Sequence, residues 1–140
     1  MLKKRVTYTD YNGLQRTEDF YFNLTKSELT EMELTTAGTF RAALQKMIDS
    51  NDVVELAKTF KEIMLKAYGE KTPDGKRFVK SPELSVAFSH TPAYDTLFME
   101  MFTDVEKMAA FVNGIMPQDM QEAAAKQMAA PMMLSTGINA

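Results

Sequence analysis

The most concentrated set of side chains that could bind an anion lies in the run KTPDGKRFVKSPE, residues 71–83. A Pro-Asp-Gly turn in this run is surrounded by four cations: Lys71, Lys76, Arg77 and Lys80. Loops that cradle phosphate use several glycines whose backbone N–H groups converge, whereas this run contains one. We therefore interpret the run as a tight turn with a solvated basic rim. The alternative is a cationic patch that docks an acidic partner.

Side chains for catalysis are scarce in this chain. It has one histidine and no cysteine, which excludes disulfides and thiolate chemistry and argues against a transition-metal site. His90 directly precedes the Thr91-Pro92 pair, so we expect it to belong to a helix junction rather than to a catalytic set. No glycine-rich nucleotide motif occurs, and the carboxylates lack the frame of a calcium loop. We expect no catalytic residues, no cofactor and no metal, and therefore not an enzyme.

The composition is that of a globular protein of about one domain. The chain has 140 residues, of which 45% are hydrophobic and 25% charged, values that are ordinary for soluble domains. Its net charge of -3 argues against a general nucleic-acid-binding surface, which is usually basic. No apolar run is long enough to span a membrane, and no apolar segment of a signal peptide follows the basic start. We expect a soluble protein of the cytoplasm.

A β-hairpin is the first element that must be placed, and we predict it over residues 3–24. Both strands alternate in polarity, and the apolar face of the second carries Phe20 and Phe22. Asn12-Gly13 marks the turn, because both residues tolerate positive φ. A lone hairpin is marginal in water, so its apolar face must pack on helices. The sequence KRFV beside the later Pro-Asp-Gly turn could add a small second hairpin.

Helix start signals recur along the rest of the chain. Thr25 and Glu28 fit a capping box, and a second helix is expected from 39 or 40 to about 48. The longest helix is predicted at about 52–68, with Gly69 at the position after its last turn. The remaining start signals are Ser81-Pro82, Thr91-Pro92 and Thr103-Asp104. Val53 and Val105 open apolar stripes that we expect to face the core, and Asn113-Gly114 ends the last helix.

Together these elements predict an α+β fold that is mostly α: an N-terminal β-hairpin packed on a bundle of about five to six short helices. We expect one globular domain over residues 1–117, with the hairpin at 3–24 and the helices at 26–113. Residues 118–140 are rich in Ala and Met and are expected to form a helical or mobile, flexible tail.

Methionine is the candidate contact residue, since 12 are present and flexible thioethers suit adaptable binding surfaces. Met101 and Met108 fall in apolar stripes and are expected in the core, whereas Met99 falls off its stripe. The candidate partner-binding residues are Met99, Met116, Met120 and Met128, with Lys76, Arg77 and Lys80 of the basic rim.

The chain resembles the tail assembly chaperones of long-tailed bacteriophages and their prophages over about residues 3–117. The resemblance rests on the runs YTDYNGLQRTEDFYFNLTKSELTEMEL, LKAYGEKTPDGKRFVKSPELSVAFSHTPAYDTLFMEMF and AAFVNGIMP. It implies a non-enzymatic protein that binds the tape measure protein and keeps it soluble and assembly-competent before tail tube subunits polymerise. Such proteins are typically absent from the finished virion, and many have a longer frameshifted form.

The resemblance also sets the expected partners. The main expected partner is the phage tape measure protein, as a helical client. The tail tube protein is a possible second partner, and the chain could form a homo-oligomer. The expected location is the host cytoplasm during phage assembly. An alternative function is a structural component of the virion tail, such as a completion or connector subunit. A third is a small regulator that binds nucleic acid through residues 71–80.

Overall fold

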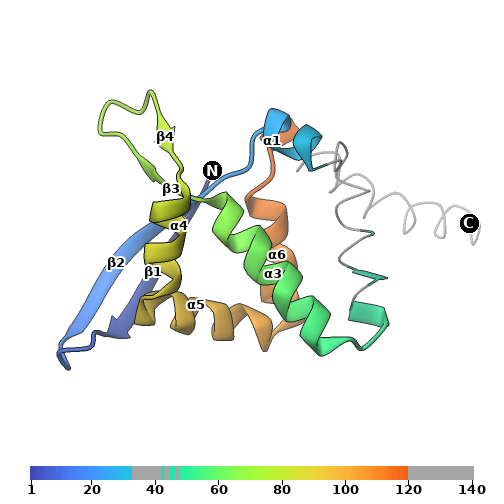
Figure 1. Ribbon diagram of the computed structural model, residues 1–140, viewed down its shortest axis with the longest axis horizontal. Helices are drawn as coiled ribbons and strands as arrows, with labels where there is room; N and C mark the ends of the chain where they lie inside the picture. Colours follow the sequence, from blue (N-terminus) through green and yellow to red (C-terminus); the bar gives the residue numbers. More distant parts are fainter. Residues whose placement is uncertain (33–41, 43–44, 47, 120–140) are drawn as a thin grey trace, which may run out of the picture.

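The structure is a computed structural model that describes residues 1–32, 42, 45–46 and 48–119. Within these ranges a four-stranded antiparallel sheet packs on one side against helices (Figure 1). The strands are β1 (Leu2–Thr9), β2 (Gln15–Phe22), β3 (Tyr68–Lys71) and β4 (Phe78–Val79). The helices are α1 (Lys26–Glu31), α3 (Val53–Ala67), α4 (Pro82–Ser89), α5 (Pro92–Phe102) and α6 (Val105–Gly114).

This architecture confirms the predicted mixed fold with an N-terminal hairpin and mostly helical remainder. The predicted second helix, from 39 or 40 to about 48, lies largely outside the described residues. So does the predicted tail, of which only residues 118 and 119 are described. None of the described helices is long and apolar enough to cross a membrane.

The first hairpin pairs β1 with β2 along their whole length, from Leu2 opposite Phe22 to Thr9 opposite Gln15. At its turn the N–H of Gly13 donates to the carbonyl of Asp10 over 3.0 Å. Gly13 has a φ of 82°, whereas Asn12 does not adopt a positive φ. The turn therefore lies where Asn12-Gly13 predicted it, and it needs a glycine at one position only.

The second hairpin begins where α3 ends, and Gly69 lies where it was predicted, directly after the C-cap residue Tyr68. Tyr68 is already extended, and Gly69 pairs with Tyr21 in the sheet instead of terminating the helix in a left-handed conformation. A Cβ at this position would lie 2.7 Å from Cε2 of Phe78 and 2.8 Å from the carbonyl oxygen of Val79. Glycine is required because β4 packs directly over it.

The predicted helix caps are confirmed, because each depends on side chains within one turn of the helix start. Thr25 and Glu28 form the full reciprocal capping box of α1. The hydroxyls of Ser81 and Thr91 accept from backbone N–H groups at the starts of α4 and α5, each with proline in the first turn. The carboxylates of Asp52 and Asp104 cap α3 and α6.

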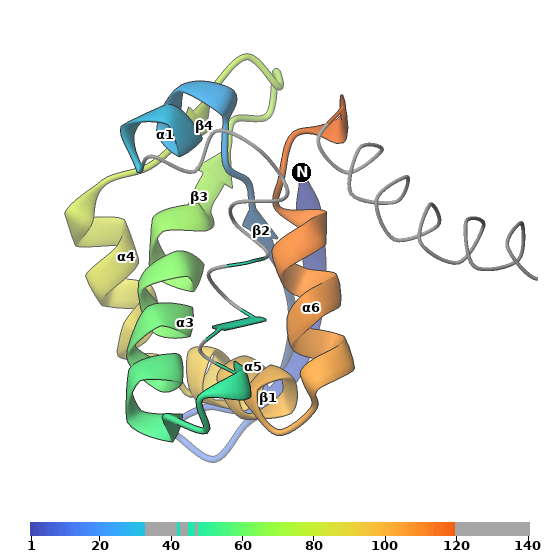
Figure 2. The same cartoon turned by 90° about the vertical axis from the view of Figure 1, so that its right-hand side faces the viewer.

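The core lies between the sheet and the helices and is built largely of aromatic rings. Figure 2 shows α3 and α6 rising from the end of the molecule at which α5 crosses, with β1 and β2 behind them. Phe22 is fully buried at the centre, and its ring centroid lies 5.8 Å from that of Phe88 and 5.1 Å from that of Phe111. Phe60 of α3 meets Phe111 of α6 at 5.6 Å. The strand β2 and the helices α3, α4 and α6 thus each contribute a ring to a shared cluster.

The segment that follows β2 ties the hairpin to two helix ends. The N–H of Asn23 donates to the carbonyl of Ala67 over 2.8 Å, and the N–H of Leu24 donates to the carbonyl of Ile115 over 2.8 Å. Both bonds join residues far apart in the sequence. They fix the last residues of α3 and the residue after α6 against the same short stretch of chain.

Candidate functional site

The ionisable side chains of the protein form no cluster of catalytic or metal-binding type in the part of the chain that the structure describes. Within the described ranges, no group of three or more His, Cys, Asp or Glu side chains could hold a metal ion. His90 is exposed at the end of α4, where its backbone N–H donates to the carbonyls of Ala87 and Phe88. The histidine therefore occupies the helix junction that its sequence context predicted.

The basic run extends from the end of β3 to the start of α4, and the turn between β3 and β4 has the predicted geometry. The N–H of Gly75 donates to the carbonyl of Thr72 over 2.9 Å, and Gly75 adopts a φ of 74°. The carboxylate of Asp74 accepts from the hydroxyl of Thr72 and from the N–H of Lys76, and the bond from Thr72 lowers the pKa of Asp74. These bonds fix the loop from inside, and they leave the side chains of Lys76 and Arg77 exposed.

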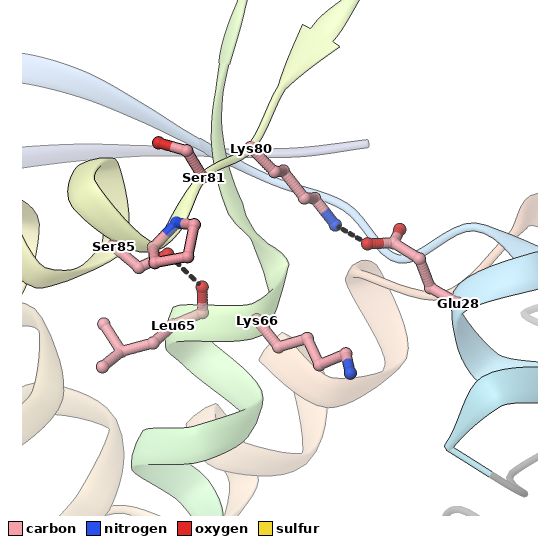
Figure 3. Close-up of a pocket in the computed structure, with 7 residues that line it drawn as sticks. Glu28, Leu65, Lys66, Lys80, Ser81 and Ser85 are labelled. Atoms are coloured by element: carbon pink, nitrogen blue, oxygen red, sulfur yellow. Dashed lines mark hydrogen bonds and ion pairs between the residues drawn. The ribbon is translucent and has the colours of Figure 1, made fainter.

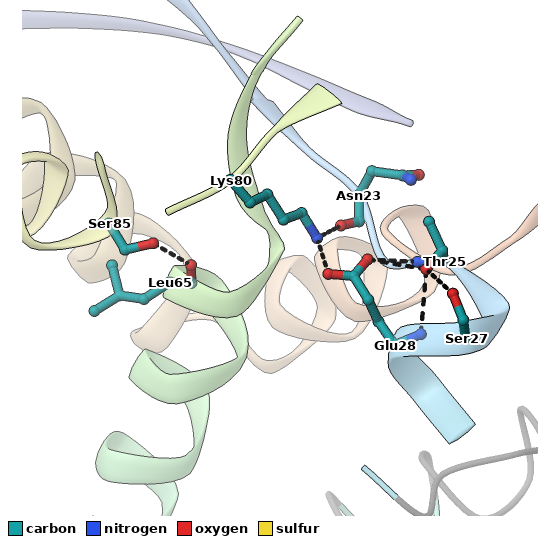
Figure 4. Close-up of polar contacts among 7 residues, drawn as sticks. All are labelled: Asn23, Thr25, Ser27, Glu28, Leu65, Lys80 and Ser85. Carbon is teal, nitrogen blue, oxygen red and sulfur yellow. Dashed lines mark hydrogen bonds and ion pairs between the residues drawn. The ribbon is translucent and has the colours of Figure 1, made fainter. Parts of the chain in front are cut away.

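Lys80 behaves differently from the two cations at the loop tip. Its ammonium lies 2.6 Å from the carbonyl of Asn23 and 2.6 Å from Oε2 of Glu28, and its side chain is only 21% exposed (Figure 4). Burial lowers the pKa of Lys80, while the contact with Glu28 opposes that shift. Burial alone would raise the pKa of Glu28, but the bonds from Lys80 and from the N–H of Thr25 lower it. Lys80 is a link between the loop and α1.

A shallow cleft of about 420 Å³ lies beside this link (Figure 3). Both serine hydroxyls that line it are engaged within the protein: that of Ser85 donates to the carbonyl of Leu65 over 2.9 Å, and that of Ser81 caps α4. Glu28, Leu65, Lys66, Lys80, Ser81, Pro82 and Ser85 line it. We interpret this cleft as the junction at which α1, α3 and α4 meet.

A second surface consists of apolar side chains at helix ends. Figures 1 and 2 agree that the start of α3, the end of α5 and the start of α6 lie at the same end of the molecule. Four large apolar side chains on these segments are exposed: Val53 by 62%, Val54 by 63%, Met99 by 47% and Val105 by 54%. We call these four residues the helix-end surface.

Most of the charged residues on the same helix ends are acidic. Asp52 and Asp104 cap α3 and α6, so each places a carboxylate beside an exposed valine. Glu100 forms an ion pair with Lys107 at 3.5 Å. The other acids on these helix ends are Glu55 and Glu106. The surface is therefore apolar with a mostly acidic border.

Two valines of this surface were predicted in the core. Val53 and Val105 continue the apolar stripes of their helices, yet each is the first helical residue after its cap, beyond the point where the core ends.

The methionines are divided between core and surface. Met99 is exposed, and Met101 and Met108 are buried in their apolar stripes as expected. The prediction of Met116 on a contact surface conflicts with its position, because its side chain is fully buried. The chain turns after α6, where the N–H of Met116 donates to the carbonyl of Asn113, and this turn directs Met116 into the core. Met120 and Met128 lie outside the described residues.

Comparison with known proteins gave one result. A family model described as phage tail assembly chaperone matches residues 1–136, which is nearly the whole chain. Neither the curated proteins nor the solved structures include a significant match.

Proposed function

Because the chain belongs to the phage tail assembly chaperone family, we propose that it is a non-enzymatic chaperone whose client is the tape measure protein. In this role it binds the tape measure protein in the host cytoplasm, keeps it assembly-competent while the tail forms, and leaves before the virion is complete. The tail tube protein is then the neighbour that replaces it on the client.

The observation that supports a helical client is the helix-end surface. An amphipathic helix binds through an apolar stripe laid against exposed apolar side chains. Val54, Met99 and Val105 provide such side chains from three different helices. Because the border of this surface is mostly acidic, the preferred client helix carries Lys or Arg beside its apolar stripe.

The basic rim is proposed as a second, weaker contact. Lys76 and Arg77 lie on the loop between β3 and β4, which projects from the end of the molecule opposite the helix-end surface (Figure 1). We propose that these two residues bind an acidic segment of a partner. Lys80 and Met116 are left out of the contact surface, because Lys80 is paired with Glu28 and Met116 is buried. Met120 and Met128 stay predicted contact residues.

Co-expression with the tape measure protein from the same phage tests the proposal. The wild-type chain is expected to hold that protein in the soluble fraction. The triple variant Val54→Asn, Met99→Gln and Val105→Asn removes the apolar contacts. Its new side chains suit their sites, because asparagine is tolerated in first turns and glutamine is a good helix former. The tape measure protein should then pellet as it does without the chaperone.

Val86→Asn is the matched control, because Val86 is 50% exposed on α4, away from the helix-end surface. This variant should keep the client soluble. If the wild-type chain does not change the solubility of the tape measure protein, the proposed client is wrong. If the triple variant still solubilises it, the client binds elsewhere on the molecule.

Mass spectrometry of purified virions separates the chaperone role from a structural one. A chaperone should be absent from the particle or present far below the amount of the tail tube protein. Stoichiometric presence would instead assign the chain to the tail structure.

A further inference from the structure

The strand β2 has a side that no described strand covers. It pairs with β1 along its whole length, but on its other side β3 pairs only with Tyr21 and Phe22. Figure 1 shows β3 and β4 turning away from β2 beyond this point. Residues 15–18 are exposed, and no described strand pairs with the β3 side of β2 from Gln15 to Asp19, so this edge is open to a further strand.

Two hydrogen bonds establish which backbone groups lie on the open edge. The N–H of Asn23 donates to the carbonyl of Ala67, so the backbone groups of Asn23 point to the β3 side. The carbonyl of Leu14 accepts from the N–H of Asp10, so the backbone groups of Leu14 point to β1. Backbone groups of a strand point alternately to its two sides. The N–H and C=O groups of Gln15, Thr17 and Asp19 therefore point to the open side, and those of even-numbered residues bond to β1.

We propose that two copies of this chain pair through this edge, antiparallel and about a two-fold axis at Thr17. Two β2 edges can exchange backbone hydrogen bonds only in registers that place odd-numbered residues opposite odd-numbered residues. The register centred on Thr17 satisfies this condition and joins the two sheets into one.

The side chains favour this register over its neighbours. It places Arg16 opposite Glu18 of the second copy, twice by symmetry, in the pair type whose side chains lie closest together. Gln15 meets Asp19, and Leu14 meets Phe20. A register centred on Glu18 would oppose two carboxylates, and one centred on Arg16 would oppose two guanidinium groups, which destabilises strand pairs.

At each end of the proposed strand pair, the hairpin turn of one copy lies beside a cleft of the other. Tyr11 and Leu14 at the hairpin turn are 85% and 59% exposed, so both side chains have apolar area that a second copy could cover. Where β2 and β3 separate, a cleft of about 360 Å³ is lined by residues 18–21 and 68–71. The turn of the second copy would enter this cleft, with its Leu14 against Phe20.

The other edge of the sheet is a poorer candidate. The outer edge of β1 carries three consecutive cations, Lys3, Lys4 and Arg5. Charged residues on an edge strand are a device that opposes pairing with another sheet. The contrast between the two edges favours β2 as the self-association surface.

Charge reversal in two separate chains gives the sharpest test. The full wild-type chain should sediment as a dimer, and its oligomeric state does not depend on the identity of any client. Arg16→Glu alone and Glu18→Arg alone should each weaken the homodimer about tenfold or more, because both pairs become repulsive. Mixing the two variants should restore a dimer, since each interchain pair is then again of opposite charge.

Proline substitution tests the backbone part of the proposal. Thr17→Pro removes an N–H that points to the open side and none that bonds to β1, so the chain should fold and sediment as a monomer. Thr7→Pro is the matched control, because Thr7 pairs with Thr17 in the hairpin and its N–H points to the outer edge of β1. This control should stay dimeric.

Circular dichroism of every variant checks that it is folded. A wild-type chain that stays monomeric at high micromolar concentration would overturn the proposal. So would a dimer that survives Thr17→Pro, or two charge variants that fail to associate with each other. If Thr17→Pro does not fold, the charge-reversal experiment still decides the question.

Discussion

The two halves of the first hairpin share one continuous ladder but are stabilised differently. The half near the chain start packs on the helices, with Val6 and Phe22 buried and Phe20 half-buried against Phe88. In the half near the turn, most side chains of residues 11–18 are exposed. We call these the packed half and the outer half.

Polar pairs across the strands hold the outer half together. The hydroxyls of Thr7 and Thr17 lie 2.9 Å apart, Arg16 lies 2.6 Å from the carboxylate of Asp10, and the hydroxyl of Tyr8 donates to Glu18. The bond from Arg16 lowers the pKa of Asp10. Each exposed pair is weak, whereas each buried ring removes a large apolar area from water. A regular hydrogen-bond pattern therefore does not indicate uniform stability.

The largest expected effect comes from the packed half. Phe22→Ala should lower the free energy of unfolding by about 3–5 kcal/mol, because it removes a fully buried ring that contacts three others and leaves a cavity. Denaturant titration measures this change. Thr17→Ala in the outer half is the control and should change the same quantity by less than about 0.5 kcal/mol. Similar losses in both variants would contradict the distinction between the halves.

The next largest effect is expected in β3, which pairs with the packed half of the hairpin at Tyr21 and Phe22. Gly69→Ala should cost about 1–3 kcal/mol, because its methyl group would overlap Phe78 and the carbonyl of Val79. Gly75→Ala separates this clash from backbone strain, since Gly75 has a φ of 74° and nothing near its missing Cβ. That control should cost about 1 kcal/mol. An unchanged Gly69→Ala protein would mean that both Phe78 and the backbone of β4 can move aside.

A smaller effect is expected where the packed half meets α1. Glu28→Gln weakens the capping box and the bond to Lys80, at a cost of about 1 kcal/mol near neutral pH. Because the folded-state pKa of Glu28 is lowered, its contribution is present above its unfolded pKa and is lost as the pH falls through the folded one. Denaturant titrations from neutral to acidic pH should therefore show a shallower acid dependence in the variant. An identical dependence would indicate that other carboxylates cause it.

The smallest effect is expected on the solvent face of the hairpin. Arg5 lies 2.9 Å from Asp19 in an ion pair whose arginine is 68% exposed. Arg5→Ala should leave the thermal midpoint almost unchanged, and added salt should not alter the difference from wild type. A clear, salt-sensitive drop in the midpoint would show that polar pairs contribute more to the hairpin than we assign them.

Local signals in the sequence were sufficient for much of the fold. The capping box at Thr25 and the proline starts at Ser81 and Thr91 depend on residues within one turn, so they could be recognised without tertiary information. The turn at Gly75 and the pairing of the first hairpin were predictable for the same reason.

The differences from prediction depend on tertiary structure. Gly69 needs no side chain because Phe78 packs over it, and Lys80 is half-buried because Glu28 reaches it from α1. Val53 is exposed because the core ends before the first turn of α3. Periodicity gives the direction of a side chain but not the extent of the core that it faces.

The bond from Leu24 to Ile115 has a consequence for synthesis on the ribosome. A hairpin can form within microseconds once its residues have emerged, but the core that covers Phe22 also needs Phe111 and Ile115. At about 5–20 residues per second, the roughly 90 residues between these partners take about 5–20 s to translate. During this interval the nascent hairpin exposes its aromatic face, so the growing chain itself is a candidate for capture by host chaperones.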